Sequence, residues 1–355
     1  MPHRLRIATF NCENLFSRPK IFEQPAAKSK ELLGYVAELQ EALKNDVFDK
    51  PRINELEKKL KGFATVNDLR GKHDSNTVIG AKEWLGGVEL TRTGFSDTAV
   101  ENTARVIADV DADVMCLIEV EDRNLLQKFH DGLLYKDFLE PAGKQGYKYV
   151  YLIDGNDPRG IDVAFLSRIP VTSFCSHIHE TTLYNGDNVK TFSRDCLEVE
   201  LEAPDGKPLH LKINHFKSMG YSPANDPQSV RRRLGQAQRV ADLLGRHDLR
   251  NEYVIVAGDL NSDPTSPSME PLVNKPHLYN TLLELPATQR GTYGTGKKQL
   301  DYVLISDALK NHLQAVRLER RGMYTKTKWM PYPTVINGRT QASDHAAVIT
   351  EFLLP

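Results

Sequence analysis

Eight short apolar runs, distributed along the whole chain of 355 residues, constrain the fold more than any other feature of the sequence. They are rich in Val, Ile, Leu and Phe and alternate only partly with polar residues. This pattern is typical of strands that are covered on both faces or that face a second sheet. We therefore predict strands at Leu5–Phe10, Val114–Ile118, Val163–Ser167, Leu197–Leu201, Leu209–Asn214, Tyr253–Ala257, Tyr302–Ile305 and Ala347–Phe352.

Two amphipathic patterns between these runs predict helices. The first helix, Thr98–Val110, has an apolar face made of Val100, Ala104, Ile107 and Ala108. The second, Pro227–Leu244, has an apolar face made of Val230, Leu234, Ala237, Val240 and Leu244. Strands that alternate with helices indicate an α/β protein built in layers.

Residues 20–96 differ in character from the rest of the chain. Ser29–Gln40 and Ile53–Lys61 are rich in Glu, Lys and Leu, which predicts a helical hairpin. The polar, glycine-containing stretch Gly71–Gly94 follows, and we interpret it as a loop or short hairpin. We predict a single catalytic domain over residues 1–355 that contains this segment as an insertion. A cap over the cleft, a binding site for a protein partner and an oligomer contact all remain open as its role.

The composition is that of an ordinary soluble globular protein, with 40% apolar and 26% charged residues. Lys and Arg number 46 and Asp and Glu 47, so the formal net charge of −1 provides no overall basic field. None of the four cysteines belongs to a CxxC pair, and nothing requires an oxidising compartment. The sequence has no long apolar leader and no stretch of about 18 apolar residues. We therefore expect a cytoplasmic protein that is not integral to a membrane.

Polar residues stand at the ends of most of the predicted strands. The set comprises Asn11, Glu119, Asn214, His215, Asp259, Asn261, Asp301, Asp344 and His345. Ligand sites in layered α/β proteins form where strand ends converge. Carboxylate and amide oxygens suit a hard cation such as Mg²⁺, with Mn²⁺ as a substitute, better than they suit zinc. Each residue alone has an ordinary explanation as a turn residue, a surface acid or a structural histidine, so the prediction rests on their joint occurrence.

Six short motifs carry a resemblance to a known family. They are Phe10-Asn11, Ile118-Glu119, Asn214-His215, Gly258-Asp259-Leu260-Asn261, Leu300-Asp301-Tyr302 and Ser343-Asp344-His345. In this order the set resembles the endonuclease/exonuclease/phosphatase superfamily, which includes deoxyribonuclease I, the abasic-site endonucleases and the neutral sphingomyelinases. The resemblance implies an α/β (α+β layered) fold of four layers, with two packed mixed β-sheets flanked by helices and the site at one end of the sandwich.

The resemblance also implies a metal site. Glu119 is the expected principal ligand, with Asn11 and Asp344 as further ligands. The family often has Asp two residues after the first Asn, whereas this chain has Glu13, which we include as a ligand that acts through water. The implied metal is Mg²⁺, which polarises a phosphoryl oxygen and offsets charge on the leaving oxygen.

Five residues receive catalytic roles from the same resemblance. Asp259 is expected to orient or deprotonate the attacking water, and Asn261 to hold that water or a phosphate oxygen. A hydrogen bond that His345 donates to Asp301 is expected to orient the imidazole, which stabilises the pentacovalent phosphorane. His215 is expected to donate to phosphate or to protonate the leaving group.

Basic and polar residues close to the motifs favour a phosphate-containing ligand. The predicted phosphate or substrate contacts are Asn214, Lys217, Arg159, Asp162 and Arg231. Tyr293 has two open interpretations, as a residue of the cleft and as packing. The segment Ala81–Leu90, with Trp84, is a candidate for a membrane-docking hairpin.

Three hypotheses for the function remain. The first is a Mg²⁺-dependent nuclease that hydrolyses DNA or RNA, because Asn214–Ser218 and Glu101–Arg105 resemble bacterial nuclease-like members of the superfamily. The second is a phosphatase or phosphodiesterase for a small or lipid phosphoester, similar to sphingomyelinases or inositol-phosphate enzymes. The third is a non-catalytic binding protein on the same fold. The first makes nucleic acid the expected partner.

Overall fold

The computed structural model describes residues 2–15, 17–44, 49–66, 88–94, 96–157, 159–220 and 222–355. The chain divides into two compact units. The first comprises Met1–Leu15 and Ser96–Pro355, and the second is Phe16–Phe95. Among the described residues, no helix is both long and apolar enough to cross a bilayer.

The first unit contains two six-stranded mixed sheets. The first sheet has the order β17 (Leu313–Glu319), β18 (Ala347–Leu354), β1 (His3–Leu15), β6 (Val114–Val120), β8 (Asp162–Ser167) and β7 (Tyr149–Ile153). β1 is parallel to β6, and the other neighbours in this sheet are antiparallel.

The second sheet has the order β15 (Leu278–Asn280), β16 (Asp301–Ser306), β14 (Tyr253–Asp259), β13 (Pro208–His215), β12 (Cys196–Glu202) and β9 (Val171–Cys175). β13 and β14 are parallel, and the other neighbours are antiparallel. A separate hairpin is formed by β10 (Thr181–Tyr184) and β11 (Asp187–Lys190).

The two sheets bury a shared apolar core between them. Because successive residues of a strand point to opposite faces, every second residue of each central strand contributes to this core. The rows are Leu5 and Ile7 of β1, Val114, Cys116 and Ile118 of β6, Leu209, Leu211 and Ile213 of β13, and Tyr253, Ile255 and Ala257 of β14. Burial of these side chains supplies the main driving force for packing the sheets together.

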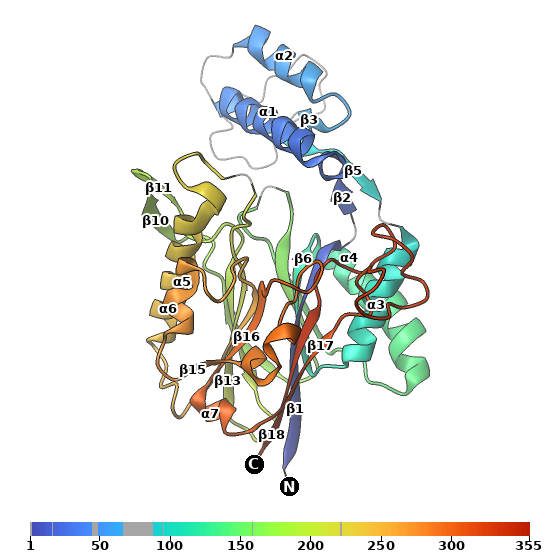
Figure 1. Cartoon of the computed structure of the whole chain (residues 1–355), viewed down its shortest axis with the longest axis vertical. Helices are drawn as coiled ribbons and strands as arrows, with labels where there is room; N and C mark the ends of the chain where they lie inside the picture. Colours follow the sequence, from blue (N-terminus) through green and yellow to red (C-terminus); the bar gives the residue numbers. More distant parts are fainter. Residues whose placement is uncertain are drawn as a thin grey trace. The chain divides into compact units, whose positions relative to one another are not determined.

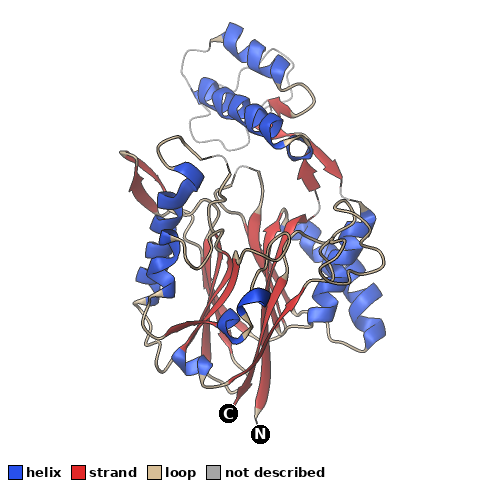
Figure 2. Ribbon diagram, in the orientation of Figure 1, coloured by secondary structure: helices blue, strands red, loops and turns tan. Residues whose placement is uncertain are grey.

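Helices cover the outer faces of both sheets (Figures 1 and 2). α3 (Asp97–Val110) begins after Ser96, whose side chain accepts a hydrogen bond from Ala99 N–H, and it packs against β1 and β18. α5 (Val230–Leu244) packs against the second sheet through Ala237 and Val240. Helix, sheet, sheet and helix make four layers, so the predicted fold class is confirmed.

The remaining helical segments of this unit are short. They are α4 (Arg123–Lys128), the π-helical η2 (Phe129–Leu139), η3 (Glu140–Ala142), η4 (Pro227–Ser229), η5 (Pro267–Met269), α6 (Glu270–Val273), η6 (Thr281–Glu284), η7 (Ala287–Gln289) and α7 (Asp307–Lys310).

All eight predicted strands are present, each within an observed strand of equal or greater length. The strands that the sequence did not predict in the two sheets are β7, β9, β15 and β17, and these four are the edge strands. Edge strands have one unpaired side and tolerate more polar residues. In β9 the last four residues are all exposed, so its pattern is not that of a buried run.

The apolar face predicted for the second helix is partly wrong. Leu234 is 36% exposed, whereas Arg233 and Gln236 are buried. Arg233 donates from Nη1 to the Lys217 carbonyl at 3.1 Å, and Gln236 Oε1 accepts from Lys217 N–H at 2.9 Å. Hydrogen bonds to a loop compensate the burial of these polar groups, which a count of apolar residues does not detect.

The second unit has its own small core. Its elements are β2 (Ser17–Pro19), η1 (Lys20–Glu23), α1 (Ala26–Lys44), α2 (Lys50–Lys59), β3 (Ala64–Val66), β4 (Val88–Leu90) and β5 (Arg92–Gly94). Leu32, Leu39 and Leu56 are among its buried residues. The two helices of the predicted hairpin are thus confirmed. The interpretations of Gly71–Gly94 as a loop and of Ala81–Leu90 as a docking hairpin concern mainly residues 67–87, which lie outside the described residues.

Candidate active site

Three neighbouring strands of the second sheet end side by side in titratable residues. His215 of β13 is paired with Asp259 of β14, which is paired with Asp301 of β16. Each lies at the even spacing that continues the core-facing row of its strand, for example Tyr253, Ile255 and Ala257 before Asp259. The site is therefore the polar end of the core between the sheets.

The first sheet adds Asn11 and Glu119 at the same end. Asn11 continues the core-facing row of β1 and donates from Nδ2 to Asp259 Oδ2 at 3.1 Å, across the two sheets. In β6 the core-facing residues are Val114, Cys116 and Ile118, so strict alternation would turn Glu119 away from the core. However, the φ of Glu119 is +63°, and the pairing of β6 with β8 shifts register there. Such an irregularity re-aims a side chain beside a site, and Glu119 Oε1 lies 3.6 Å from His215 Nε2.

Asp259 is held by several N–H donors. Asn261 donates from its backbone N–H to Oδ1 at 2.8 Å and from Nδ2 to Oδ2 at 3.1 Å, in addition to the bond from Asn11. Burial raises the pKa of Asp259 to about 7; His345 opposes this effect, and the charges of Asp301 and Glu119 add to it. A carboxyl with a pKa near neutrality is suited to proton transfer at physiological pH.

Asp301 and His345 form a buried pair. His345 Nδ1 lies 2.8 Å from Asp301 Oδ2, so the predicted hydrogen bond is confirmed. Burial acts against the charged imidazole, but the carboxylate of Asp301 outweighs it and holds the pKa of His345 well above its usual value. The Ser343 hydroxyl accepts from His345 N–H at 2.9 Å, and the Tyr293 ring lies with its centroid 4.8 Å from that of His345. Tyr293 therefore contacts the site.

His215 has the opposite charge preference. Burial, followed by the positive charges of Arg194 and Arg159, lowers the pKa of His215 well below its usual value. Its Nε2 faces two carboxylates, at 3.6 Å from Glu119 and 3.8 Å from Asp259. The site thus contains one imidazole that is neutral and one that is charged at neutral pH.

Two backbone positions fix the loop after β14. Asn261 has a φ of +49°, which places its amide beside Asp259. Gly258 has a φ of +132°, and a Cβ there would lie 1.9 Å from the Asn214 carbonyl oxygen. Only glycine permits this approach of β14 to β13, so Gly258 is required for the position of Asp259.

Arg194 is a residue of this region that the sequence analysis missed. It is 1% exposed, its Nε lies 2.9 Å from Asp157 Oδ2, and its Nη1 donates to the Phe216 carbonyl at 3.0 Å. Asn261 Nδ2 donates to the same carbonyl. The two predicted strands that became β12 and β13 are an antiparallel pair, so the residues just before β12 lie beside the end of β13. A search of the residues that precede predicted strands would therefore have found Arg194.

Glu13 and Asp344 lie at the margin of this group. Glu13 donates from its backbone N–H to Asn11 Oδ1 at 2.9 Å, and its carboxylate accepts from Gln341 Nε2 at 2.9 Å. Asp344 Oδ1 lies 3.8 Å from His345 Nε2, and Asp344 is hydrogen-bonded to Tyr293. Their roles as metal ligands stay predictions.

Three of the predicted phosphate contacts already have protein partners. Arg159 donates to both carboxylate oxygens of Asp157, at 2.8 and 2.6 Å. Arg231 donates from Nη2 to Asn185 Oδ1 and to the Asn225 carbonyl, near the β10–β11 hairpin. Asp162 is buried and accepts from Gly155 N–H at 2.8 Å, which indicates a positioning role rather than direct contact.

Asn214 and Lys217 lie close to the end of β13. Asn214 is buried, and its Oδ1 has no hydrogen-bond donor among the residues that the structure describes. Burial and the charges of Arg194 and Arg159 lower the pKa of Lys217 to about 8. The positive charge that lowers the pKa of both Lys217 and His215 also favours an anionic ligand.

The donor set fits a divalent cation. Carboxylate oxygens of Asp259 and Asp301 lie within 4.8 Å of each other, and Glu119 and Asp259 both face Nε2 of His215. Asp301 Oδ1 is buried and has no hydrogen-bond donor within the described parts of the chain. Crowded carboxylates with an unsatisfied oxygen are stabilised by a bound cation or its water.

Comparisons with known proteins identify the family of the chain. The profile of the endonuclease/exonuclease/phosphatase family matches residues 93–345. A comparison with curated proteins finds no match.

Solved structures share the fold. The endonuclease/exonuclease/phosphatase from Beutenbergia cavernae is 17% identical with a TM-score of 0.53, over 99% of this chain and 72% of that one. Family proteins from Bacteroides thetaiotaomicron and Bacteroides vulgatus are 13% and 11% identical, each with a TM-score of 0.50, over 100% and 99% of this chain and 99% and 100% of theirs. At these identities the likeness shows the fold alone. With the family profile covering most of its length, the chain belongs to the endonuclease/exonuclease/phosphatase family, whose members are generally metal-dependent phosphoesterases.

Proposed function

We propose that this protein is a Mg²⁺-dependent phosphodiesterase, and specifically a nuclease that hydrolyses DNA phosphodiester bonds by in-line attack of water. One observation carries the proposal. The Asp259 carboxylate is fixed by one amide donor from the first sheet and another from the loop after β14, directly beside a hydrogen-bonded Asp301–His345 pair. This arrangement joins a base to a positively charged group, as hydrolysis of a phosphodiester requires.

The residues have distinct roles in this proposal. Asp259 accepts the proton of the attacking water, and Asn11 and Asn261 hold its carboxylate in one orientation. His345, kept charged by Asp301, stabilises the negative charge that develops on the phosphorane. Neutral His215 donates a hydrogen bond to a phosphate oxygen or to the leaving oxygen.

Glu119 and Asn11 are the residues that would hold the metal, with Asp344 and Glu13 as further candidates. When bound, Mg²⁺ supplies Lewis-acid polarisation of the phosphoryl oxygen. The oxygen-rich donor set supports a hard cation, since cysteine is absent from it.

The choice of DNA rests on two supports. The Asn214–Ser218 and Glu101–Arg105 segments resemble bacterial nuclease-like relatives. Arg194, Arg159 and Lys217 also lie close enough to influence the site electrostatically, and this local positive charge favours phosphate although the net charge is −1.

Incubation with supercoiled plasmid DNA tests the proposal. Wild-type protein with Mg²⁺ is expected to nick the plasmid, and excess chelator is expected to stop the reaction. Asp259→Ala is expected to nick at least 100-fold more slowly, because it removes the base. Equal nicking by wild type and variant would refute the nuclease assignment.

A generic phosphodiester substrate distinguishes a phosphodiesterase with another substrate from a protein without phosphodiesterase activity. Mg²⁺-dependent turnover of bis-p-nitrophenyl phosphate, with plasmid untouched, would assign the site to a small or lipid phosphoester. Failure on both substrates would favour a binding protein on this fold.

A further inference from the structure

A second group of metal-ligand side chains lies at the other end of the second sheet. It consists of His210, His247 and Glu252, whose ligand atoms all lie within 4.8 Å of one another. His210 lies five residues before His215 in β13, and Glu252 directly precedes β14, which ends at Asp259. Five residues of extended strand span roughly 16 Å. This group is therefore separate from the candidate active site.

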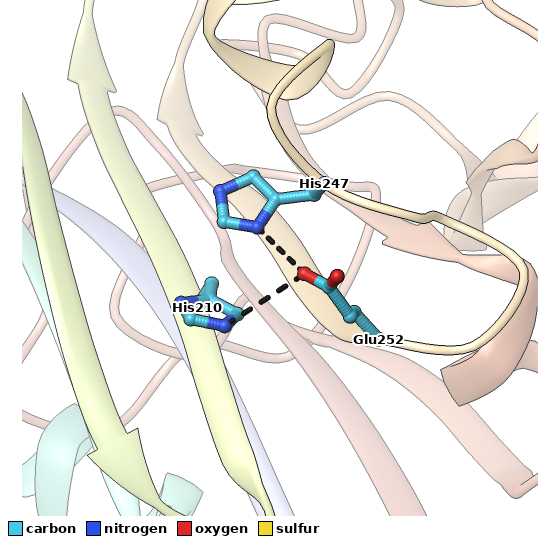
Figure 3. A group of neighbouring side chains, drawn as sticks. All are labelled: His210, His247 and Glu252. Carbon is cyan, nitrogen blue, oxygen red and sulfur yellow. Dashed lines mark hydrogen bonds and ion pairs between the residues drawn. The ribbon is translucent and has the colours of Figure 1, made fainter.

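Both imidazoles point toward the same carboxylate (Figure 3). His247 Nδ1 lies 2.9 Å from Glu252 Oε2, and His210 Nε2 lies 3.9 Å from the same oxygen. The two ring centroids are 4.5 Å apart. Ligand atoms at about 2.0–2.2 Å from a tetrahedral Zn²⁺ are themselves roughly 3.3 Å apart. Small side-chain rotations would thus bring all three onto one ion.

Neighbouring groups hold the ligands in this orientation. His210 Nδ1 lies 3.6 Å from Glu200 Oε2, so a carboxylate faces the ring nitrogen that does not face Glu252. A carboxylate in that position favours the tautomer with its lone pair on the metal-facing nitrogen. Glu252 is also fixed, because its Oε1 accepts from Asp248 N–H at 3.3 Å.

Lys212 is the group that opposes a cation here. Its Nζ lies 3.2 Å from His247 Nε2, but it also donates to Glu198 Oε2 at 2.5 Å, which balances its charge. Lys212 approaches the ring nitrogen that does not face Glu252. Metal binding therefore requires the His247 proton to move from Nδ1 to Nε2, with Lys212 then bonded to Glu198 alone.

Solvent can reach the cluster. The side chains of His210, His247 and Glu252 are 21%, 13% and 42% exposed. Of the three residues, His247 alone lines a neighbouring pocket of about 500 Å³, together with Asp248, Asn251 and His277. Three protein ligands beside solvent leave a coordination position for water.

We propose that His210, His247 and Glu252 form a second metal site, which binds one transition-metal dication, Zn²⁺ above all, with water as the fourth ligand. Imidazole nitrogens favour such ions over Mg²⁺, and two histidines with one glutamate are a ligand set that proteins use for zinc. The ion links β13 to the turn between α5 and β14. This site does not depend on the function proposed above.

Zn²⁺ binding to the full-length, metal-depleted protein tests the proposal, measured by competition with a chromophoric chelator. Wild type is expected to bind one more Zn²⁺ than His247→Asn or Glu252→Gln. His277→Asn is the matched control, because this histidine lines the same pocket but bonds to Asp307, and its φ of +64° is one that Asn adopts readily. It is expected to bind Zn²⁺ as wild type does. Glu200→Gln is expected to weaken binding about 10–100-fold without changing the stoichiometry.

Three further readouts distinguish loss of the metal site from a general loss of structure. Co²⁺ is expected to give the d–d absorption of a tetrahedral ion in wild type and His277→Asn but not in Glu252→Gln. The Gln side chain keeps an acceptor for Asp248 N–H, so circular dichroism of the metal-free variant is expected to match wild type. Mg²⁺-dependent plasmid nicking is expected to be unchanged in His247→Asn. Equal Zn²⁺ stoichiometry and affinity in wild type, His247→Asn and Glu252→Gln would overturn the proposal, as would an equal loss in His277→Asn.

Discussion

At the scale of single residues, the two buried aspartates of the candidate site have different surroundings. Asp259 accepts from two asparagine side chains and one backbone N–H, whereas Asp301 bonds to one imidazole through a single oxygen. The first environment fixes a carboxylate whose pKa is near neutral, and the second keeps a neighbouring histidine charged. Residues of the same type thus receive different roles from their positions.

Asp301→Asn tests the role of the pair. Asparagine keeps the size of the side chain but removes the charge that favours the protonated His345. We expect kcat for phosphodiester hydrolysis to fall about 10²–10⁴-fold, measured under saturating substrate and Mg²⁺. Asp307→Asn is the matched control, because Asp307 forms a comparable contact with His277, at 2.7 Å, outside the site. The same kcat in both variants would argue against a catalytic role for Asp301.

Asp162→Asn tests the energetic effect of a buried acid. Burial raises the pKa of Asp162 from 3.8 to about 7. Between these values the unfolded chain releases the proton and the folded protein keeps it, so this residue lowers stability as pH rises from about 4 to about 7. Asparagine has no such titration and keeps an acceptor for Gly155 N–H.

The free energy of unfolding, measured in urea at several pH values, checks this prediction. The variant is expected to gain roughly 2–4 kcal/mol relative to wild type between pH 4 and pH 7, with no further gain above, since one pKa unit corresponds to about 1.4 kcal/mol. Asp187→Asn, on the exposed β11 strand, is the control. A pH-independent difference between Asp162→Asn and wild type would contradict the account.

At the scale of secondary-structure elements, burial decides what the sequence reveals. The eight predicted strands are interior strands, whereas β7, β9, β15 and β17 are edges. Exposure permits polar residues in β9 and β17, and β15 has only three residues. The apolar run of β7, Tyr149–Ile153, could have been predicted from the sequence. The prediction of the buried face of α5 failed because polar residues are buried there. Arg233 and Gln236 are buried because they bond to the loop at Lys217, and Leu234 is exposed instead.

The candidate site could also be predicted only in part from the sequence. His215, Asp259 and Asp301 continue core-facing rows, so strand-end reasoning brings them together correctly. Arg194 was missed because it precedes its strand rather than following it. The orientation of Glu119 also depends on a backbone irregularity that apolar periodicity does not encode.

Gly258→Ala tests the packing of β13 against β14. A Cβ at Gly258 would lie 1.9 Å from the Asn214 carbonyl oxygen, at a φ of +132°. We expect a loss of about 3 kcal/mol or more in the free energy of unfolding, measured by urea denaturation. Gly235→Ala in α5 is the control, because its Cβ meets nothing within 4 Å, and it is expected to stabilise by about 0.5–1 kcal/mol. Similar effects of the two substitutions would contradict the close approach.

At the scale of the whole molecule, the chain combines two compact units with separate cores. Every residue assigned to the candidate site belongs to the first unit. The chemistry and the integrity of the second unit are therefore expected to be separable.

Leu56→Ala tests this separation. Leu56 is fully buried in the core of the second unit, and its truncation is expected to destabilise that unit by about 2–5 kcal/mol. Hydrogen exchange is expected to accelerate in α1 and α2, while kcat for phosphodiester hydrolysis stays within twofold of wild type. Lys61→Ala, an exposed substitution in the same unit, is the control. A parallel collapse of kcat would show that the second unit takes part in the chemistry.

The Mg²⁺ dependence of phosphodiester hydrolysis, compared between wild type and Glu119→Gln, tests the central claim most directly. Glutamine keeps the shape of the side chain that faces His215 but removes the charge proposed to hold the metal. We predict that wild type is saturable by Mg²⁺ and that the variant needs at least tenfold more Mg²⁺ for half-maximal rate, or shows no hydrolysis. The same Mg²⁺ dependence in both proteins would contradict a metal-assisted phosphodiesterase site at Glu119.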